Sequence, residues 1–181
     1  ILGVTAVAAA LVAVPAILLV YAKEHRQFGD DQVALLITLR PWLYCPMIVA
    51  CGYLADRVGH LRVTSIAAGL LAAGTGLLLA ATGPVAVLAA LMLTALSPLM
   101  YMFSILAVLS ASPPGRAHIY LAVYYVMCMI PGLSPLALAW LAQRQPNISL
   151  GIIVGLALAC AAAGLCFGKR PAPKVEPPTT P

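Results

Sequence analysis

The sequence predicts an all-α membrane protein, a bundle of six transmembrane helices. Of its 181 residues, 63% are hydrophobic and only 8% are charged, and the mean hydropathy is +1.03. Soluble globular domains carry roughly a quarter charged residues, so this chain has too few charges to cover a surface in contact with water. One crossing of a bilayer takes about 20 helical residues, and the chain is long enough for six.

Six apolar runs follow one another along the chain and are separated by polar or Pro- and Gly-rich segments. They form one expected transmembrane domain, residues 1–168, with spans at about 1–21, 34–55, 62–81, 85–109, 117–141 and 149–168. Segment 22–33 is the most charged, so we expect it to lie in water. Segment 169–181 has five prolines and no apolar run, which predicts a disordered Pro-rich cytoplasmic tail.

The basic residues predict the orientation. Six Lys and Arg residues lie on the side of the membrane that holds both termini, and three lie on the other side. Cytoplasmic loops carry the excess of these residues. We therefore expect an integral, multi-pass protein of a bacterial inner (plasma) membrane with both termini in the cytoplasm. The basic residues are scattered and form no patch that could follow a phosphate backbone, so the lipid bilayer, and not nucleic acid, is the expected partner.

The sequence has none of the patterns that are typical of catalytic or metal sites. It lacks a Gly-x-Ser-x-Gly elbow, a phosphate-binding loop, a His-Glu-x-x-His pair and paired carboxylates. All five cysteines lie in apolar runs without metal-ligand spacing, which is typical of small packing residues. We expect no enzyme activity, no metal, no cofactor and no disulfide.

The most specific motif joins the second and third runs. Gly52, Asp56, Arg57 and Gly59 are spaced as G-x-x-x-D-R-x-G, and Arg62 follows. Two spans must reverse direction in about six residues, and Gly59 tolerates the positive φ that such a turn requires. Gly52 permits close contact between helices, and Asp56 is placed where a buried carboxylate could meet the positive amino-terminal end of a neighbouring helix. Arg57 and Arg62 mark the cytoplasmic face.

This motif resembles the loop signature of the major facilitator superfamily, which lies between the second and third helices of a six-helix half. The sequence departs from the fuller signature at His60 and Leu61, where the family has basic residues. Weakened copies of this kind are more usual in the second half of such transporters. The resemblance therefore implies half of a major-facilitator fold, the carboxy-terminal half, in which the motif serves as a conformational gate.

The resemblance also implies a function, the transport of a small-molecule substrate by alternating access between two six-helix halves. The chain starts inside an apolar run without Met, which favours a fragment whose partner is the missing half of the same transporter. A small protein that pairs with a second copy of itself is the alternative. A different class of function also stays open, a six-helix structural or assembly subunit without its own transport path.

Four polar side chains form a stripe on the fourth run. Thr94, Ser97, Tyr101 and Ser104 are spaced by three, four and three residues, so they share one face of a helix. The fourth helix of each half lines the central cavity in the resembled family, which makes these residues candidate substrate contacts, with Ser97 and Tyr101 as the first choices. The alternative is that the hydroxyls bond to their own helix and pack against a neighbour.

Arg40 is the only charged residue inside an expected span. By helix rise it lies about 7 to 9 Å from the outer end of its run, where an arginine can reach the membrane surface. Asp30 or Asp31 of the outer linker could pair with it. Arg40 is therefore a fifth candidate for the substrate cavity, where it would bind an anionic substrate, and the alternative is an anchor or an outer gate.

Overall fold

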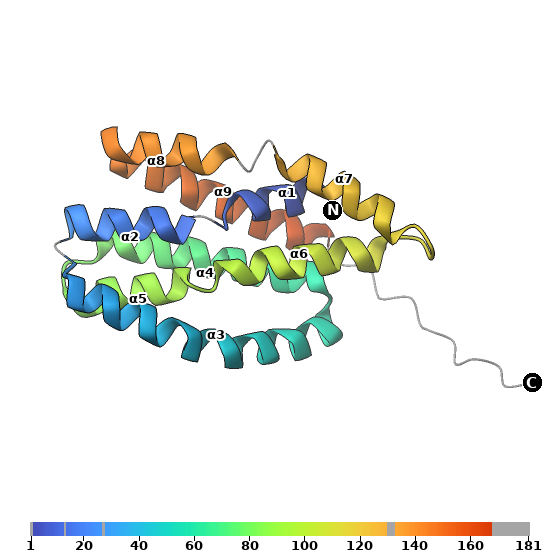
Figure 1. Cartoon of the computed structure of the whole chain (residues 1–181), viewed down its shortest axis with the longest axis horizontal. Coiled ribbons are helices and arrows are strands. Elements are labelled where there is room, and N and C mark those ends of the chain that lie inside the picture. Colours follow the sequence, from blue (N-terminus) through green and yellow to red (C-terminus); the bar gives the residue numbers. More distant parts are fainter. Residues whose placement is uncertain (1, 13, 27, 130–132, 168–181) are drawn as a thin grey trace, which may run out of the picture.

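The computed structural model describes residues 2–12, 14–26, 28–129 and 133–167, and within these residues the regular elements are all helices. Figure 1 shows that the helices run side by side along one long axis. In chain order they are α1 Leu2–Ala10, α2 Val14–His25, α3 Asp30–Val58, α4 His60–Ala80, α5 Pro84–Thr94, α6 Ser97–Ala111, α7 Ala117–Met129, α8 Ser134–Arg144 and α9 Pro146–Phe167. The expected tail, 169–181, lies outside the described residues.

The expected number of six spans is not confirmed. Among the described residues, five helical segments are long and apolar enough to cross a membrane, namely α3, α4, α5 with α6, α7 with α8, and α9. The first apolar run forms α1 and α2 in place of one continuous helix. Pro15 explains this break, because proline has no N–H to donate and its ring clashes with the carbonyl four residues earlier. At the start of α2 its missing N–H costs nothing.

A second proline interrupts the fourth run. α5 ends at Thr94, and α6 begins at Ser97 with Pro98 in its first turn. The polar stripe, which the sequence predicts on one straight helix, is therefore divided between two helices. The fifth run is likewise divided into α7 and α8, and residues 130–132 between them lie outside the described part of the chain.

The charged linker between the first and second runs is shorter than expected, because α2 continues to His25 and α3 begins at Asp30. The backbone N–H of Gly29 donates to the side-chain oxygen of Gln32 at 3.2 Å, which caps α3. Asp30 and Asp31 lie in the first turn, where negative charge stabilises the positive end of a helix. Four residues of the expected linker therefore belong to α3.

The turn between α3 and α4 is also shorter than expected. Gly59 alone separates the two helices, with φ 95° and ψ 146°. The prediction that this position needs a positive φ is confirmed. The N–H of Gly59 donates to the carbonyl of Ala55 at 2.8 Å and so closes the end of α3.

The core of the bundle lies around α4, and α3 lies at its edge. α4 contacts α5, α6 and α9 closely, and Figure 1 shows α3 as a bowed helix on the outside of the bundle. Pro41 and Pro46 inside α3 account for the bow. Only Leu36 and Ala55 of this helix are buried. The start of α1 and the end of α9 lie at the same end of the bundle.

Candidate functional site

A cavity of about 250 Å³ lies between α2, α3 and α5. Its polar lining residues are Arg40 of α3 and Thr94 of α5, two of the five candidates from the sequence. The other lining residues are apolar: Val12, Pro15, Ala16, Leu19, Leu36, Ile37, Leu91 and Ala95. The fold therefore brings together two polar residues that lie on different apolar runs.

Arg40 lies farther from the start of its helix than the sequence predicts. It is ten residues from Asp30, so it lies about 15 Å along α3 from the first residue. Neither pairing that the sequence leaves open is found among the described residues: Asp30 forms an ion pair with Lys23 at 2.6 Å, and Asp31 has no ion pair with Arg40. Within the described residues the guanidinium of Arg40 has no hydrogen bond or ion pair. Its donors are free to bind an anion.

Thr94 and Ser97, which flank the break between α5 and α6, are fully buried. The hydroxyl of Thr94 donates to the carbonyl of Leu91 at 2.8 Å, which leaves its oxygen able to accept a further hydrogen bond. The hydroxyl of Ser97 has no hydrogen-bond partner in the described part of the chain. An unpaired buried hydroxyl costs about 1–3 kcal/mol, so a polar solute that reached Ser97 would relieve this cost.

The α6 part of the polar stripe, Tyr101 and Ser104, contacts α7. The hydroxyl of Ser104 donates to the carbonyl of Tyr101 at 2.7 Å and lies 3.0 Å from the hydroxyl of Tyr124. The rings of Tyr101 and Tyr124 are 6.3 Å apart, and Tyr124 is fully buried. Ser104 thus joins α6 to α7, which is the packing alternative that the sequence leaves open for this stripe.

The candidate gate residues lie at the other end of α3, and two of them differ from expectation. A Cβ added at Gly52 would meet no atom within 4 Å, and the side chain of Asp56 is exposed. The expected close contact and the expected burial are both missing, because no described residue covers the outward face of α3. Arg57 lies 4.4 Å above the ring of Tyr53 and donates to its hydroxyl. Arg62, in the first turn of α4, is half-buried.

An exposed stripe runs along the outward face of α3. We call it the α3 stripe, and it consists of residues spaced by three, four, four and three positions: Trp42, Cys45, Val49, Tyr53 and Asp56. Its apolar members are widely exposed, Trp42 at 79% and Val49 at 73%. The acid of the gate motif is therefore continuous with an uncovered apolar surface.

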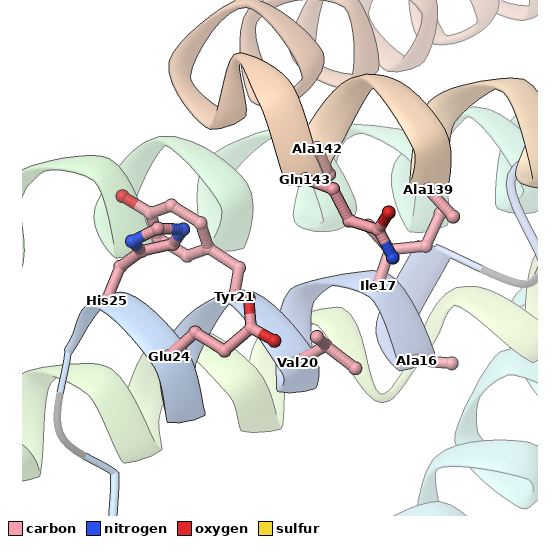
Figure 2. A pocket seen from close by; sticks show the side chains of 9 residues that line it. All are labelled: Ala16, Ile17, Val20, Tyr21, Glu24, His25, Ala139, Ala142 and Gln143. Atoms are coloured by element: carbon pink, nitrogen blue, oxygen red, sulfur yellow. The ribbon is translucent and has the colours of Figure 1, made fainter.

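A second cavity of about 250 Å³ lies between α2 and α8 (Figure 2). Its polar lining residues are Tyr21, Glu24 and His25 of α2 and Gln143 of α8. This site is not among the predicted ones, because the first apolar run ends at Tyr21 and the charged residues that follow are typical of a linker. The spacing of Ile17, Tyr21 and Glu24 by four and three residues could have indicated that they share one helix face.

Comparison with known proteins decides the family. The model of the Major Facilitator Superfamily matches the chain over residues 1–181. This chain belongs to the major facilitator superfamily. No curated protein and no solved structure matches it.

Membership of the major facilitator superfamily implies a secondary transporter, and members of the family are transporters and not enzymes. The family and the long apolar helices of the chain together indicate an integral, multi-pass membrane protein that lies in the bilayer and binds small solutes. The α2–α3–α5 cavity, which holds Arg40, borders two of the segments that are long and apolar enough to cross a membrane, α3 and α5 with α6.

Proposed function

We propose that this chain is one half of a secondary carrier that moves a small solute across the membrane by alternating access. In this proposal α1 and α2 together make the sixth crossing, since their combined length of about 30 Å equals the thickness of the hydrocarbon core. Both termini lie in the cytoplasm of a bacterial cell, as the excess of Lys and Arg on their side favours.

The cavity that holds Arg40 carries the proposal. An arginine inside a membrane span costs up to about 2.5–3.5 kcal/mol at the centre and less towards the surface, so such residues usually serve a function. Here the guanidinium borders a cavity and has no partner among the described residues. Its planar fork fits a carboxylate or phosphate group, so the proposed solute carries one. Thr94 would contact the polar remainder of the solute, and Ser97, which does not line the cavity, would do so only if α5 and α6 moved apart.

Tyr101 and Ser104 have a secondary part in this proposal. Tyr101 is half-buried and lies on α6 one turn beyond Ser97, so it remains a candidate contact. Ser104 is engaged with Tyr124, which favours a packing role.

The uncovered α3 stripe supports a second half as the partner. This half would be the missing six helices of the same transporter or a second copy of the chain, and the weakened loop motif favours the carboxy-terminal identity for the half described. Asp56 and Arg57 would then open and close the cytoplasmic side as the two halves rock. The alternative of a structural subunit is not favoured by membership of a transporter family.

Cysteine labelling tests this proposal. The five native cysteines are replaced by serine in the complete natural polypeptide, and Ile37→Cys places one thiol in the wall of the Arg40 cavity. In vesicles of defined sidedness, a membrane-impermeant maleimide should label this thiol from the outside and also from the inside, because each side opens in turn.

The matched control is Ile66→Cys on α4. Ile66 is 44% exposed and lines neither of the two cavities described, so we expect no labelling from either side. Labelling of Ile37→Cys from neither side would contradict a solute path through this cavity and would favour a structural subunit.

A further inference from the structure

We propose that the cavity between α2 and α8 is a binding site for a small organic ammonium group. The cavity lies at the end of the bundle where α2 and α8 finish (Figure 1). It adjoins the cavity that holds Arg40, since Ala16 lines both, but all its other lining residues differ. The proposal concerns binding alone and holds whether or not the bound molecule is transported.

The size and the walls of the cavity define what it can hold. Its volume of about 250 Å³ is below the roughly 300–1,000 Å³ of sites for drug-sized molecules, so the ligand is small. Ile17, Val20, Ala139 and Ala142 provide apolar walls from both helices. The ligand therefore has an apolar part.

The aromatic group of the cavity is held in place. Tyr21 is 6% exposed, and its ring centroid lies 5.0 Å from that of His25. An aromatic ring attracts a cation to its face, and a buried ring does so without losing freedom on binding. Figure 2 shows Tyr21 and Glu24 on α2 and Gln143 reaching in from α8. The amide oxygen of Gln143 is an acceptor, so its partial negative charge can face the ammonium group.

Glu24, an exposed residue, supplies the one acidic side chain among the lining residues that the structure describes, and it makes the cavity negative. The described lysine and arginine side chains at this end of the bundle contact other groups, and His25 lies against the ring of Tyr21. Lys23 pairs with Asp30 at 2.6 Å, Arg26 donates to the carbonyl of Leu79, and Arg144 lies 4.7 Å above the ring of Trp140. Within the described ranges Glu24 has no ion pair. A carboxylate beside apolar walls and an aromatic ring selects a cation with an apolar body.

A metal ion does not fit this cavity. Divalent cations need several oxygen, nitrogen or sulfur ligands, whereas Glu24 is the only carboxylate that lines it. In the part of the chain that the structure describes, there is no group of three His, Cys, Asp or Glu side chains that could hold a metal. An inorganic anion is disfavoured by the charge of Glu24.

Two sources could supply the ammonium group, a dissolved amine and the headgroup of phosphatidylethanolamine in the adjacent leaflet. Choline serves as the probe, and its uncharged isostere, with carbon in place of nitrogen, serves as the comparator. Binding to the complete natural polypeptide is measured by titration calorimetry in detergent. We expect choline to bind and the isostere to bind at least about tenfold more weakly, which corresponds to about 1.4 kcal/mol.

Substitutions locate the site. Glu24→Gln should weaken choline binding at least tenfold, and Ala142→Leu, which fills the cavity, should do the same. Asp31→Asn is the matched control, because it removes an exposed carboxylate at the same end of the bundle outside the cavity, and it should leave binding unchanged. Thermal melting of each variant verifies that the protein is folded.

Vesicles distinguish the two sources. If phosphatidylethanolamine vesicles displace choline and phosphatidylglycerol vesicles do not, the ligand is a lipid headgroup. If neither displaces it, the ligand is a dissolved amine. Equal binding of choline and its isostere would overturn the proposal, as would unchanged binding by folded Glu24→Gln protein or an equal loss in Asp31→Asn.

Discussion

α3 and α4 are adjacent in the chain and are both apolar enough to cross a membrane, yet they differ in how they are covered. In the most apolar window of α4, 56% of the residues are buried, compared with 6% in α3. Within a bilayer the hydrophobic effect does not drive helices together, so close packing decides which helices associate. α4 is rich in small residues, whereas α3 has two prolines and exposes Trp42. Apolarity therefore places both helices in the membrane, and the small residues of α4 allow the close packing that α3 lacks.

Gly74 of α4 should give the largest effect on stability. A Cβ here would lie 2.8 Å from Cγ2 of Thr94 and 2.9 Å from the carbonyl oxygen of Ala90, which is backbone and cannot move away. Gly74→Ala should therefore destabilise the protein by about 1–3 kcal/mol, measured by thermal melting in detergent.

The control for this site is Gly76→Ala on the same helix, where an added Cβ meets nothing within 4 Å. Equal melting temperatures for the two variants would show that α4 does not depend on close approach to α5.

Gly164 of α9 should give the next largest effect. A Cβ here would collide with Oγ of Ser65 and lie 3.2 Å from the carbonyl oxygen of Leu61. The serine would have to abandon its 2.9 Å hydrogen bond to that carbonyl, so Gly164→Ala should cost about 1 kcal/mol. Gly155→Ala on the exposed side of α9 is the control, and an equal loss there would argue against a specific contact between α4 and α9.

The contact between α6 and α7 should contribute less. Tyr124→Phe and Ser104→Ala, singly and together, form a double-mutant cycle for their 3.0 Å hydrogen bond. Such bonds within membranes average about 0.6 kcal/mol, and we expect a coupling energy of this size from thermal melting. A coupling energy of zero would mean that the hydroxyls do not join the two helices.

The exposed end of α3 should give the smallest effect. Arg57→Lys keeps the charge but loses the planar group that lies over Tyr53. We expect at most about 0.5 kcal/mol of destabilisation, since this contact is exposed. A loss above 1 kcal/mol would indicate that Arg57 supports the fold itself.

Local sequence features were predictable, and contacts between distant helices were not. The positive φ of Gly59 follows from the sharp turn that two neighbouring spans require, and the structure confirms it. The cavity that joins Arg40 to Thr94 depends on how α2, α3 and α5 pack, which no spacing within one run encodes. Pro15 is a local feature whose effect was not predicted. The sequence shows a proline in the first run, but one continuous helix was expected there.

The site at the end of α2 shows a different limit. Glu24 follows Lys23 and precedes His25, so its segment reads as a charged linker. α2 continues through these residues and places Tyr21 and Glu24 on one cavity wall. Charge pattern alone does not separate a solvated linker from the last turn of a helix.

The most direct test of a second half that covers the α3 stripe is the access of oxygen to Cys45. This native cysteine belongs to the stripe and is exposed. A spin label is attached there in the complete natural polypeptide, with the other cysteines replaced by serine, and its collisions with oxygen are measured in lipid vesicles. A label at Leu158→Cys on α9, 54% exposed, reports a surface in contact with lipid. We predict that oxygen reaches Cys45 much less often than position 158, and equal access at the two positions would contradict a covering half.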